Sequence, residues 1–165
     1  MRPKRTTELE VVLYYGETGT GKTRTWHDKY VGSEEFYRVP VGRDVWFDGY
    51  DMHKYVLLDD FSGAASHMSL ATLLQILDRY PLQVPVKGSF VWWMPDKICI
   101  TTNIRPIHWY KWEGRESQYQ ALKRRIHKVL DFDKKDAEGN ALDATDSFWD
   151  IDDVPFDTNV YECNY

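Results

Sequence analysis

The segment VVLYYGETGTGKTRTW, residues 11–26, decides the fold, because it places a glycine-rich turn between a strand-like run and a helix-compatible run. Its centre, GETGTGKT, fits the pattern GxxxxGK[ST], in which backbone N–H groups, a lysine and a hydroxyl together bind phosphates and Mg²⁺. We therefore predict a phosphate-binding loop for a nucleoside triphosphate. Its residues are Gly16, Glu17, Thr18, Gly19, Thr20, Gly21, Lys22 and Thr23, with Lys22 on the phosphates and Thr23 on the metal.

The composition indicates a single globular domain. The 165 residues are 42% hydrophobic and 15% aromatic, which is enough to bury one core. Apolar runs such as FVWWM are far shorter than the roughly 20 residues of a membrane helix. Only two cysteines are present, so neither a disulfide framework nor a cysteine-based metal cluster is indicated. We expect a soluble chain without a membrane partner.

Charge divides the chain into two unlike parts. Residues 1–130 carry 19 basic and 15 acidic side chains, whereas residues 131–165 carry 2 basic and 11 acidic ones. A mildly basic body can attract a polyanion, while an acidic, Asp-rich tail is typical of irregular, solvated backbone. We expect a mostly irregular tail, in which Phe148, Trp149 and Phe156 could pack back on the body.

Strand and helix patterns alternate along the chain. The predicted strands are 9–15, 55–61 and 97–103, the predicted helices are 22–30, 69–80 and 116–130, and shorter extended pieces are 36–40 and 44–50. The apolar stripes of the last two helices are Leu70, Leu73, Leu74 and Leu77, and Tyr119, Leu122, Ile126 and Val129. This order predicts an α/β fold, a largely parallel sheet flanked by helices.

Polar residues follow two of these strands. Asp59 and Asp60 end the strand in YVLLDDF, 36 and 37 residues after Thr23, where one carboxylate can hold Mg²⁺ and the other can polarise the attacking water. Asn103 ends the strand in ICITTN, and its amide can orient water against a γ-phosphate. A phosphate loop alone does not distinguish kinases, switches and motors. The distinction therefore depends on later residues such as these.

A β-hairpin is predicted over residues 82–93, with Lys87-Gly88 at its tip. A lysine in that position can contact a phosphate without reading bases. Phe90 and Trp92 on the second arm could stack on a base, but the alternation of a strand favours a place in the core for them.

The motifs GETGTGKT, VLLDDF, VPVKG, ITTN and ALKRRI, in that order, resemble those of superfamily 3 helicases. More narrowly, WFDGYDMHKYVLLDDF, LDRYPLQVPVKG and ITTNIRPIHWY are similar to the helicase domain of replication initiator (Rep) proteins from circovirus-like, circular single-stranded DNA viruses. The resemblance covers roughly residues 9–132, and the final Asn164-Tyr165 is also family-like.

This resemblance implies an AAA+-like P-loop NTPase with a pore β-hairpin. It also implies a homo-oligomer, a hexameric ring that holds ATP and Mg²⁺ between subunits and single-stranded DNA in its pore. In that family Lys22 and Thr23 would bind phosphate and Mg²⁺, and Asp59 would be the acid on the Mg²⁺ side. Asp60 would activate water and Asn103 would be the sensor.

The resemblance further implies an arginine finger that acts on the neighbouring subunit. Arg124 and Arg125 match its position, and Arg125 is preferred. Lys87 and Gly88 would form the DNA-contacting tip of the pore hairpin. The expected function is 3′-to-5′ DNA unwinding during rolling-circle replication in a host nucleus.

The chain departs from the family in two respects. Rep proteins of this kind also carry an origin-nicking endonuclease with paired histidines, whereas the histidines here are widely spaced. We therefore expect a linker remnant at 1–8, the helicase domain at 9–132 and the acidic tail at 133–165, without the nuclease. The Asp-Asp pair in place of Asp-Glu also leaves open which carboxylate activates water.

Two other functions are compatible with these motifs. One is a monomeric, nucleotide-dependent kinase, which would need an acceptor site and an arginine-bearing lid within one subunit. The other is a non-catalytic, nucleotide-gated DNA-binding assembly module, which would form rings with ATP but would not turn it over.

Overall fold

A computed structural model describes residue 4, residues 7–40 and residues 47–151 of the chain. Its main sheet has six strands in the order β2-β3-β6-β1-β7-β8. The strands are β1 (Glu10–Tyr15), β2 (Phe36–Arg38), β3 (Tyr55–Leu58), β6 (Lys97–Thr102), β7 (Lys128–Lys135) and β8 (Ala141–Asp143). All neighbours pair in parallel except β7 and β8, which confirms the predicted, largely parallel sheet.

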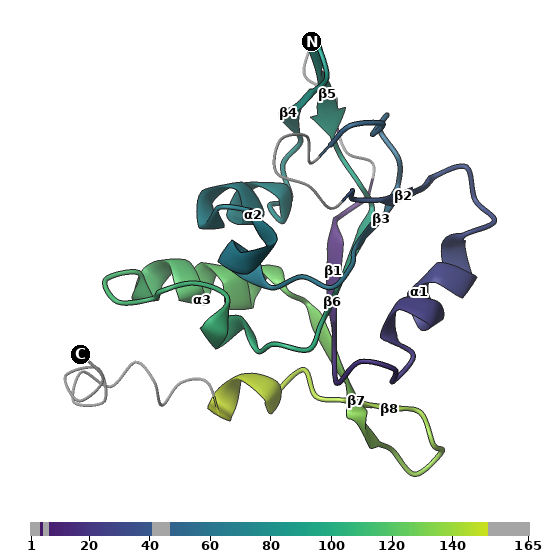
Figure 1. The fold of residues 1–165 in the computed structure, drawn as a ribbon, viewed down its shortest axis with the longest axis vertical. Helices are drawn as coiled ribbons and strands as arrows, with labels where there is room; N and C mark the ends of the chain where they lie inside the picture. Colours follow the sequence, from purple (N-terminus) through teal and green to yellow (C-terminus); the bar gives the residue numbers. More distant parts are fainter. Residues whose placement is uncertain (1–3, 5–6, 41–46, 152–165) are drawn as a thin grey trace.

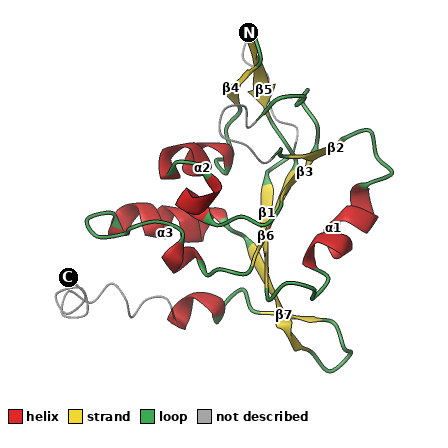
Figure 2. Cartoon of the chain, in the orientation of Figure 1, coloured by secondary structure: helices red, strands yellow, loops and turns green. Residues whose placement is uncertain are grey.

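Helices cover both faces of the sheet (Figures 1 and 2). Helix α1 (Lys22–Tyr30) lies on one face, and α2 (Leu70–Ile76) and α3 (Glu116–Arg125) lie on the other. A separate two-stranded sheet, β4 (Leu82–Val86) and β5 (Ser89–Trp93), forms the predicted hairpin. Three short 3₁₀ helices are η1 (Gly63–Ser66), η2 (Pro106–His108) and η3 (Phe148–Ile151).

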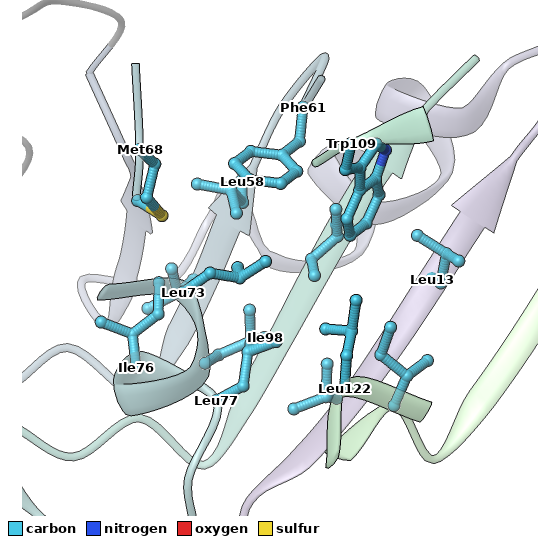
Figure 3. Packing of buried hydrophobic residues seen from close by; sticks show 14 of the residues in the cluster. Leu13, Leu58, Phe61, Met68, Leu73, Ile76, Leu77, Ile98, Trp109 and Leu122 are labelled. Carbon is cyan, nitrogen blue, oxygen red and sulfur yellow. The ribbon is translucent and has the colours of Figure 1, made fainter. Parts of the chain in front are cut away.

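The apolar residues of the central strands alternate between two cores, because successive side chains of a strand point to opposite faces. Val11 and Leu13 join the larger core under α2 and α3, whereas Val12 and Tyr14 join the smaller core under α1. Figure 3 shows Leu73 and Ile76 of α2 beside Ile98 of β6 in the larger core. Burial on both faces explains why these strands are rich in Val, Ile and Leu.

The third helix is shorter than its apolar stripe predicted. It ends at Arg125, and residues 128–135 form β7 instead of continuing the helix to residue 130. The strand pairs with the open side of β1, where Val12 lies opposite Lys128 and Tyr15 opposite Asp131. Without this pairing, buried N–H and C=O groups of β1 would have no partner, so sheet formation overrides the helical period.

Helix α2 also stops early, at Ile76, although the stripe predicted a helix to Tyr80. Leu70, Leu73 and Leu77 are buried as predicted, whereas Leu74 is only partly buried. The predicted strands at 9–15, 55–61 and 97–103 and the helix at 22–30 are confirmed, with small shifts of their ends.

The acidic segment after residue 132 is not mostly irregular within the described residues. Strand β7 continues past residue 132 to Lys135, β8 pairs with it, and η3 follows. Phe148 and Trp149 are 2% and 7% exposed, which confirms that they pack back on the body. Phe148 stacks edge-on against Tyr15 of β1, and Trp149 against Tyr119 of α3.

Some predictions concern residues outside the described part of the chain. These are most of the linker at 1–8, the extended piece at 44–46, the packing of Phe156, and the Asn164-Tyr165 ending. Of the described rest of that extended piece, residues 47–49 form a turn.

Candidate nucleotide site

The glycine-rich segment forms the loop between β1 and α1. The Gly16 N–H donates to the Thr102 carbonyl of β6, which ties the start of the loop to the sheet. Gly21 has a φ of 91° and lies directly before α1, a left-handed conformation that glycine adopts without a steric penalty. A Cβ on Gly16 would lie 3.0 Å from the Phe132 Cβ, so a larger residue there would force β7 or the loop to shift by a few tenths of an ångström.

Lys22 begins α1 and turns its side chain back into the loop. Only 6% of the residue is exposed. Its Nζ donates to the Gly16 and Glu17 carbonyls at 2.6 and 2.7 Å, and lies 3.4 Å from the Thr20 hydroxyl. An ammonium held inside the loop by two carbonyls is positioned to neutralise phosphate oxygens that enter it.

Thr23 and Asp59, the two predicted metal ligands, are in contact. The Thr23 hydroxyl donates to Asp59 Oδ1 at 2.5 Å, although the two residues are 36 positions apart in sequence. Strand β6 separates β3 from β1 in the sheet, so the carboxyl ends of these three parallel strands meet at one edge. The contact therefore follows from the strand order together with the turn into α1.

Two further residues hold Asp59, and the sequence analysis assigned neither. The Thr101 hydroxyl of β6 donates to Oδ1 at 2.7 Å, and the Arg38 guanidinium of β2 pairs with Oδ2. Burial raises the pKa of Asp59, but the hydrogen bonds from Thr23 and Thr101 and the charge of Arg38 outweigh it, so the pKa falls below its usual value. The carboxylate is therefore charged at neutral pH.

Thr101 and Arg38 had weak sequence signals. Thr101 lies within ITTN, but threonine is common in strands, and Arg38 ends a strand of three residues. Only the pairing of β2 with β3, which sets Arg38 opposite Leu57, brings the guanidinium to the acid.

Asp60 lies beside Asp59 but faces the loop instead of the sheet. It has a φ of 50°, a left-handed conformation that aspartate tolerates better than most residues, and its N–H donates to the Thr101 hydroxyl. The residue is exposed and lines an open cavity of about 440 Å³ with the phosphate loop. The other residues of that cavity are Thr18, Gly19, Thr20, Gly21, Lys22, Thr23 and Arg24.

Asn103 follows β6 at the same edge of the sheet. It is exposed and lies in a bend directly after Thr102, whose carbonyl receives the Gly16 N–H. The structure thus places Asn103 next in sequence to a residue that holds the loop, and its role as sensor stays a prediction.

Asp133 of β7 supports the loop from the side opposite to Asp59. Its Oδ1 accepts the Glu17 N–H at 2.9 Å, and its own N–H donates to the carboxylate of the buried Asp131. This contact was not predicted, because residues after 132 were expected to form an acidic tail. The available signal was the segment VLDF, residues 129–132, whose β-branched and aromatic residues are compatible with a strand.

The hairpin lies at one end of the molecule, far from the phosphate loop (Figure 1). Its tip is Lys87-Gly88, between the paired residues Val86 and Ser89, and both tip residues are exposed. Phe90 is 66% exposed, so the expectation that it belongs to the core is wrong. Trp92 is partly buried. Phe90 therefore lies in solvent three residues from Lys87.

The two arginines of α3 differ in their surroundings. Arg125 donates to the Leu74 carbonyl at 2.6 Å and forms an ion pair with Asp78 at 3.6 Å, which links α3 to the end of α2. Arg124 is exposed. Helix α3 lies on the face of the sheet opposite to α1.

The loop and its acids fit a nucleotide with Mg²⁺. The loop supplies backbone donors and Lys22 for phosphates, and Thr23 and Asp59 supply oxygens, the ligand type that Mg²⁺ prefers. Among the described residues, no group of three or more His, Cys, Asp or Glu could hold a metal ion. Phosphate oxygens and water would complete the shell of a Mg²⁺ ion here, as is usual for this ion. No helix in the described ranges has the length and apolar character of a membrane span.

A parallel α/β sheet with this loop after its first strand, and an acid pair after another strand of the sheet, defines the class of P-loop nucleotide-binding proteins. Comparison with protein families narrows the class. Residues 12–104 match the family model described as RNA helicase. The chain belongs to this helicase family, in the form found in viral replication-associated proteins.

Three relatives illustrate the similarity. The replication-associated protein of pigeon circovirus is 42% identical over 123 residues, 74% of this chain and 36% of the relative. That of beak and feather disease virus is 41% identical over 104 residues, 63% of this chain and 33% of the relative. That of porcine circovirus 1 is 32% identical over 162 residues, 98% of this chain and 49% of the relative. The chain therefore spans about a third to a half of the length of these relatives.

Proposed function

We propose that this chain is an ATP-hydrolysing motor that moves on single-stranded DNA during rolling-circle replication of a viral genome. The contact between Thr23 and Asp59 carries the proposal, because it joins the phosphate loop and the acidic strand end in one place. The name that these relatives share, replication-associated protein, supports the biological setting. We further propose an AAA+-like hexameric ring and replication in the host nucleus.

Each group has a role in this mechanism. The loop amides and Lys22 would hold the phosphates of ATP, while Thr23 and Asp59 would hold Mg²⁺, which neutralises charge that develops on the phosphates. Asp60, which is exposed in the same cavity, accepts a proton from the attacking water. Asn103 orients that water from the end of β6.

The arginine finger is assigned to Arg124 in preference to Arg125. The guanidinium of Arg125 already binds Leu74 and Asp78 of its own subunit, whereas Arg124 is exposed and can reach a neighbouring copy. An arginine supplied by a neighbour can accelerate phosphoryl transfer by about 10³–10⁵. The hairpin tip at Lys87 and Gly88 contacts DNA phosphates, and the exposed Phe90 can stack on a base.

The substitution Lys22→Ala tests the proposal. Loss of the buried ammonium should reduce ATP hydrolysis by at least about 100-fold, the effect of removing one charge-stabilising donor from such a site. Full activity in this variant would end the motor hypothesis. Stimulation of the wild-type ATPase by single-stranded DNA but not by RNA supports the proposed substrate, and the reverse would make the motor an RNA helicase.

The same assay separates the alternatives. ATP turnover per subunit that rises with protein concentration and with DNA argues against a monomeric kinase, because the first dependence requires self-association and the second requires DNA binding. Ring formation with ATP but negligible turnover would instead identify a nucleotide-gated assembly module.

A further inference from the structure

Arg38 is a charged residue at the nucleotide site that the proposed mechanism does not use. It ends β2, the edge strand, and its guanidinium pairs with Oδ2 of Asp59. The Asp59 side chain is 9% exposed, whereas that of Arg38 is 54% exposed. The acid is thus held in place by the protein, while most of the arginine lies in water.

Both carboxylate oxygens of Asp59 already have partners. Oδ1 accepts the hydroxyls of Thr23 and Thr101 at 2.5 and 2.7 Å, and Oδ2 faces the guanidinium. The guanidinium is the only fixed positive charge that the described residues place on this carboxylate. A divalent cation that binds Asp59 would therefore meet a positive charge already in contact with the acid.

We propose that Arg38 and a divalent cation compete for Asp59, so that Arg38 acts as a latch which a bound metal must displace. The inference rests on the proposed function, since it concerns the regulation of the same metal site. The latch can open because a half-exposed arginine side chain keeps its charge in water when it leaves, and exposed ion pairs are weak. Thr23 and Thr101 keep Asp59 in place after Arg38 has moved.

Titration of the whole chain with Mn²⁺, without nucleotide, tests the latch. Free Mn²⁺ is followed by electron paramagnetic resonance in the wild type and in Arg38→Gln. The variant should bind Mn²⁺ more tightly, by up to about fivefold, which is the upper end of what an exposed ion pair of this kind contributes. An unchanged dissociation constant, weaker binding, or no bound Mn²⁺ in either protein would overturn the proposal.

Arg79→Gln is the matched control. Arg79 is an exposed arginine whose guanidinium contacts the Tyr80 ring and hydroxyl. It lies just after α2 in the chain and is not part of the nucleotide site. Its loss changes the net charge by the same amount, so an equal gain in Mn²⁺ affinity would show a general charge effect and contradict the latch. If Arg38→Gln fails to fold, Arg38→Met, which keeps the aliphatic stem, replaces it.

Failure of the latch can be told apart from failure of the motor. A fluorescent ATP analogue, titrated in EDTA, measures phosphate-loop binding without any metal. Wild-type protein that binds no analogue would count against the motor, while the Mn²⁺ comparison would still decide the latch. Wild type and Arg38→Gln should bind the analogue equally well in EDTA but differ in their affinity for Mn²⁺. That result would assign the effect of Arg38 to metal binding and not to nucleotide binding.

Discussion

The Thr23 hydroxyl is 2.5 Å from Asp59 Oδ1, so the last residue of the phosphate loop touches the first acid after β3. Strand β6 lies between the two strands concerned, and its Thr101 donates to the same oxygen. Three segments that are distant in sequence therefore hold one carboxylate. A substitution of Asp59 therefore tests whether these segments form one site.

The substitution Asp59→Asn should separate nucleotide binding from hydrolysis. Asparagine keeps the size of the side chain but removes the charge that would bind Mg²⁺. We expect ATP hydrolysis in Mg²⁺ to fall by at least about 100-fold, comparable to the loss of one charge-stabilising group. Binding of a fluorescent ATP analogue in EDTA should persist, because Lys22 and the loop amides are unchanged.

Thr25→Ala provides the control for this variant. Thr25 is an exposed threonine of the same helix, and its hydroxyl donates to the Gly21 carbonyl. It should hydrolyse ATP at close to the wild-type rate, whereas Thr23→Ala should follow Asp59→Asn. Normal hydrolysis by both Thr23→Ala and Asp59→Asn would show that the metal binds elsewhere.

The sequence was sufficient for the parts of the site that depend on local order. A glycine pattern after a strand predicts a phosphate loop, and parallel strands bring their carboxyl ends together, so Thr23 and Asp59 could be expected at one edge. Arg38 and Asp133 could not be found this way. Their contacts depend on which strand lies next to β3 and β1, and a sequence does not state strand order.

Two other misjudgements have the same physical origin. The apolar spacing of residues 116–130 fits a helix. Residues 128–131 nevertheless form a strand, because pairing with β1 satisfies the backbone hydrogen bonds on the open side of that strand. The alternation of residues 89–93 fits a strand with one buried face, but the hairpin projects from the sheet and leaves Phe90 exposed. Local pattern locates an element better than it predicts where the element ends or which surface it packs on.

Lys87→Ala should weaken binding to single-stranded DNA without changing basal ATP hydrolysis. The loss of one phosphate contact should make the negative slope of log K against log salt shallower by about 0.7 for a single strand. Figure 1 shows the hairpin at one end of the molecule, far from the loop between β1 and α1, so the nucleotide site should not be affected. Fluorescence anisotropy with a labelled oligonucleotide at several salt concentrations measures the slope.

Lys111→Ala is the charge-matched comparison for this experiment. Lys111 is exposed but lies after η2, away from the hairpin tip. Equal losses of affinity in the two variants would show that only the overall charge matters, and Lys87 would then be an ordinary turn residue.

Tyr14→Phe should protect the fold at alkaline pH. Burial, followed by the influence of Cys99, Tyr30 and Glu10, raises the pKa of Tyr14 well above the value of about 10 that an unfolded chain shows. Because the folded-state pKa is the higher one, ionisation of Tyr14 favours the unfolded chain. This group therefore leaves the free energy of unfolding unchanged below pH 10 and lowers it as the pH rises above 10. The loss amounts to about 1.4 kcal/mol per pH unit, until the folded-state pKa is reached.

The variant should therefore match the wild type in urea denaturation at pH 7 and exceed it at pH 11. Tyr80→Phe, which removes the hydroxyl of a residue that is 54% exposed, serves as the control. A stability difference between Tyr14→Phe and wild type that stays constant from pH 7 to pH 11 would contradict the assignment.

Arg124 and Arg125 should differ in what their loss does to the protein alone. Arg125→Ala removes the donor to the Leu74 carbonyl and should lower the free energy of unfolding by about 1–3 kcal/mol, the cost of an unsatisfied, partly buried carbonyl. Arg124→Ala removes only an exposed side chain and should unfold like the wild type. Thermal denaturation of the two variants therefore identifies the structural arginine before any assay of activity.

Mixing subunits then decides which arginine acts across an interface. An Asp60→Asn subunit lacks the acid in its own pocket but keeps Arg124, while an Arg124→Ala subunit keeps the acid and lacks the arginine. At a mixed interface the intact acid of one subunit can face the intact arginine of the other, so ATP hydrolysis should reappear when the two inactive proteins are combined.

Mixtures of Asp60→Asn with Arg125→Ala should show no such recovery beyond the residual activity of Arg125→Ala, because Arg125 is bound to α2 of its own subunit. Recovery with Arg125→Ala and none with Arg124→Ala would reverse the assignment, since it would require Arg125 to leave Leu74 and Asp78 when the subunits assemble.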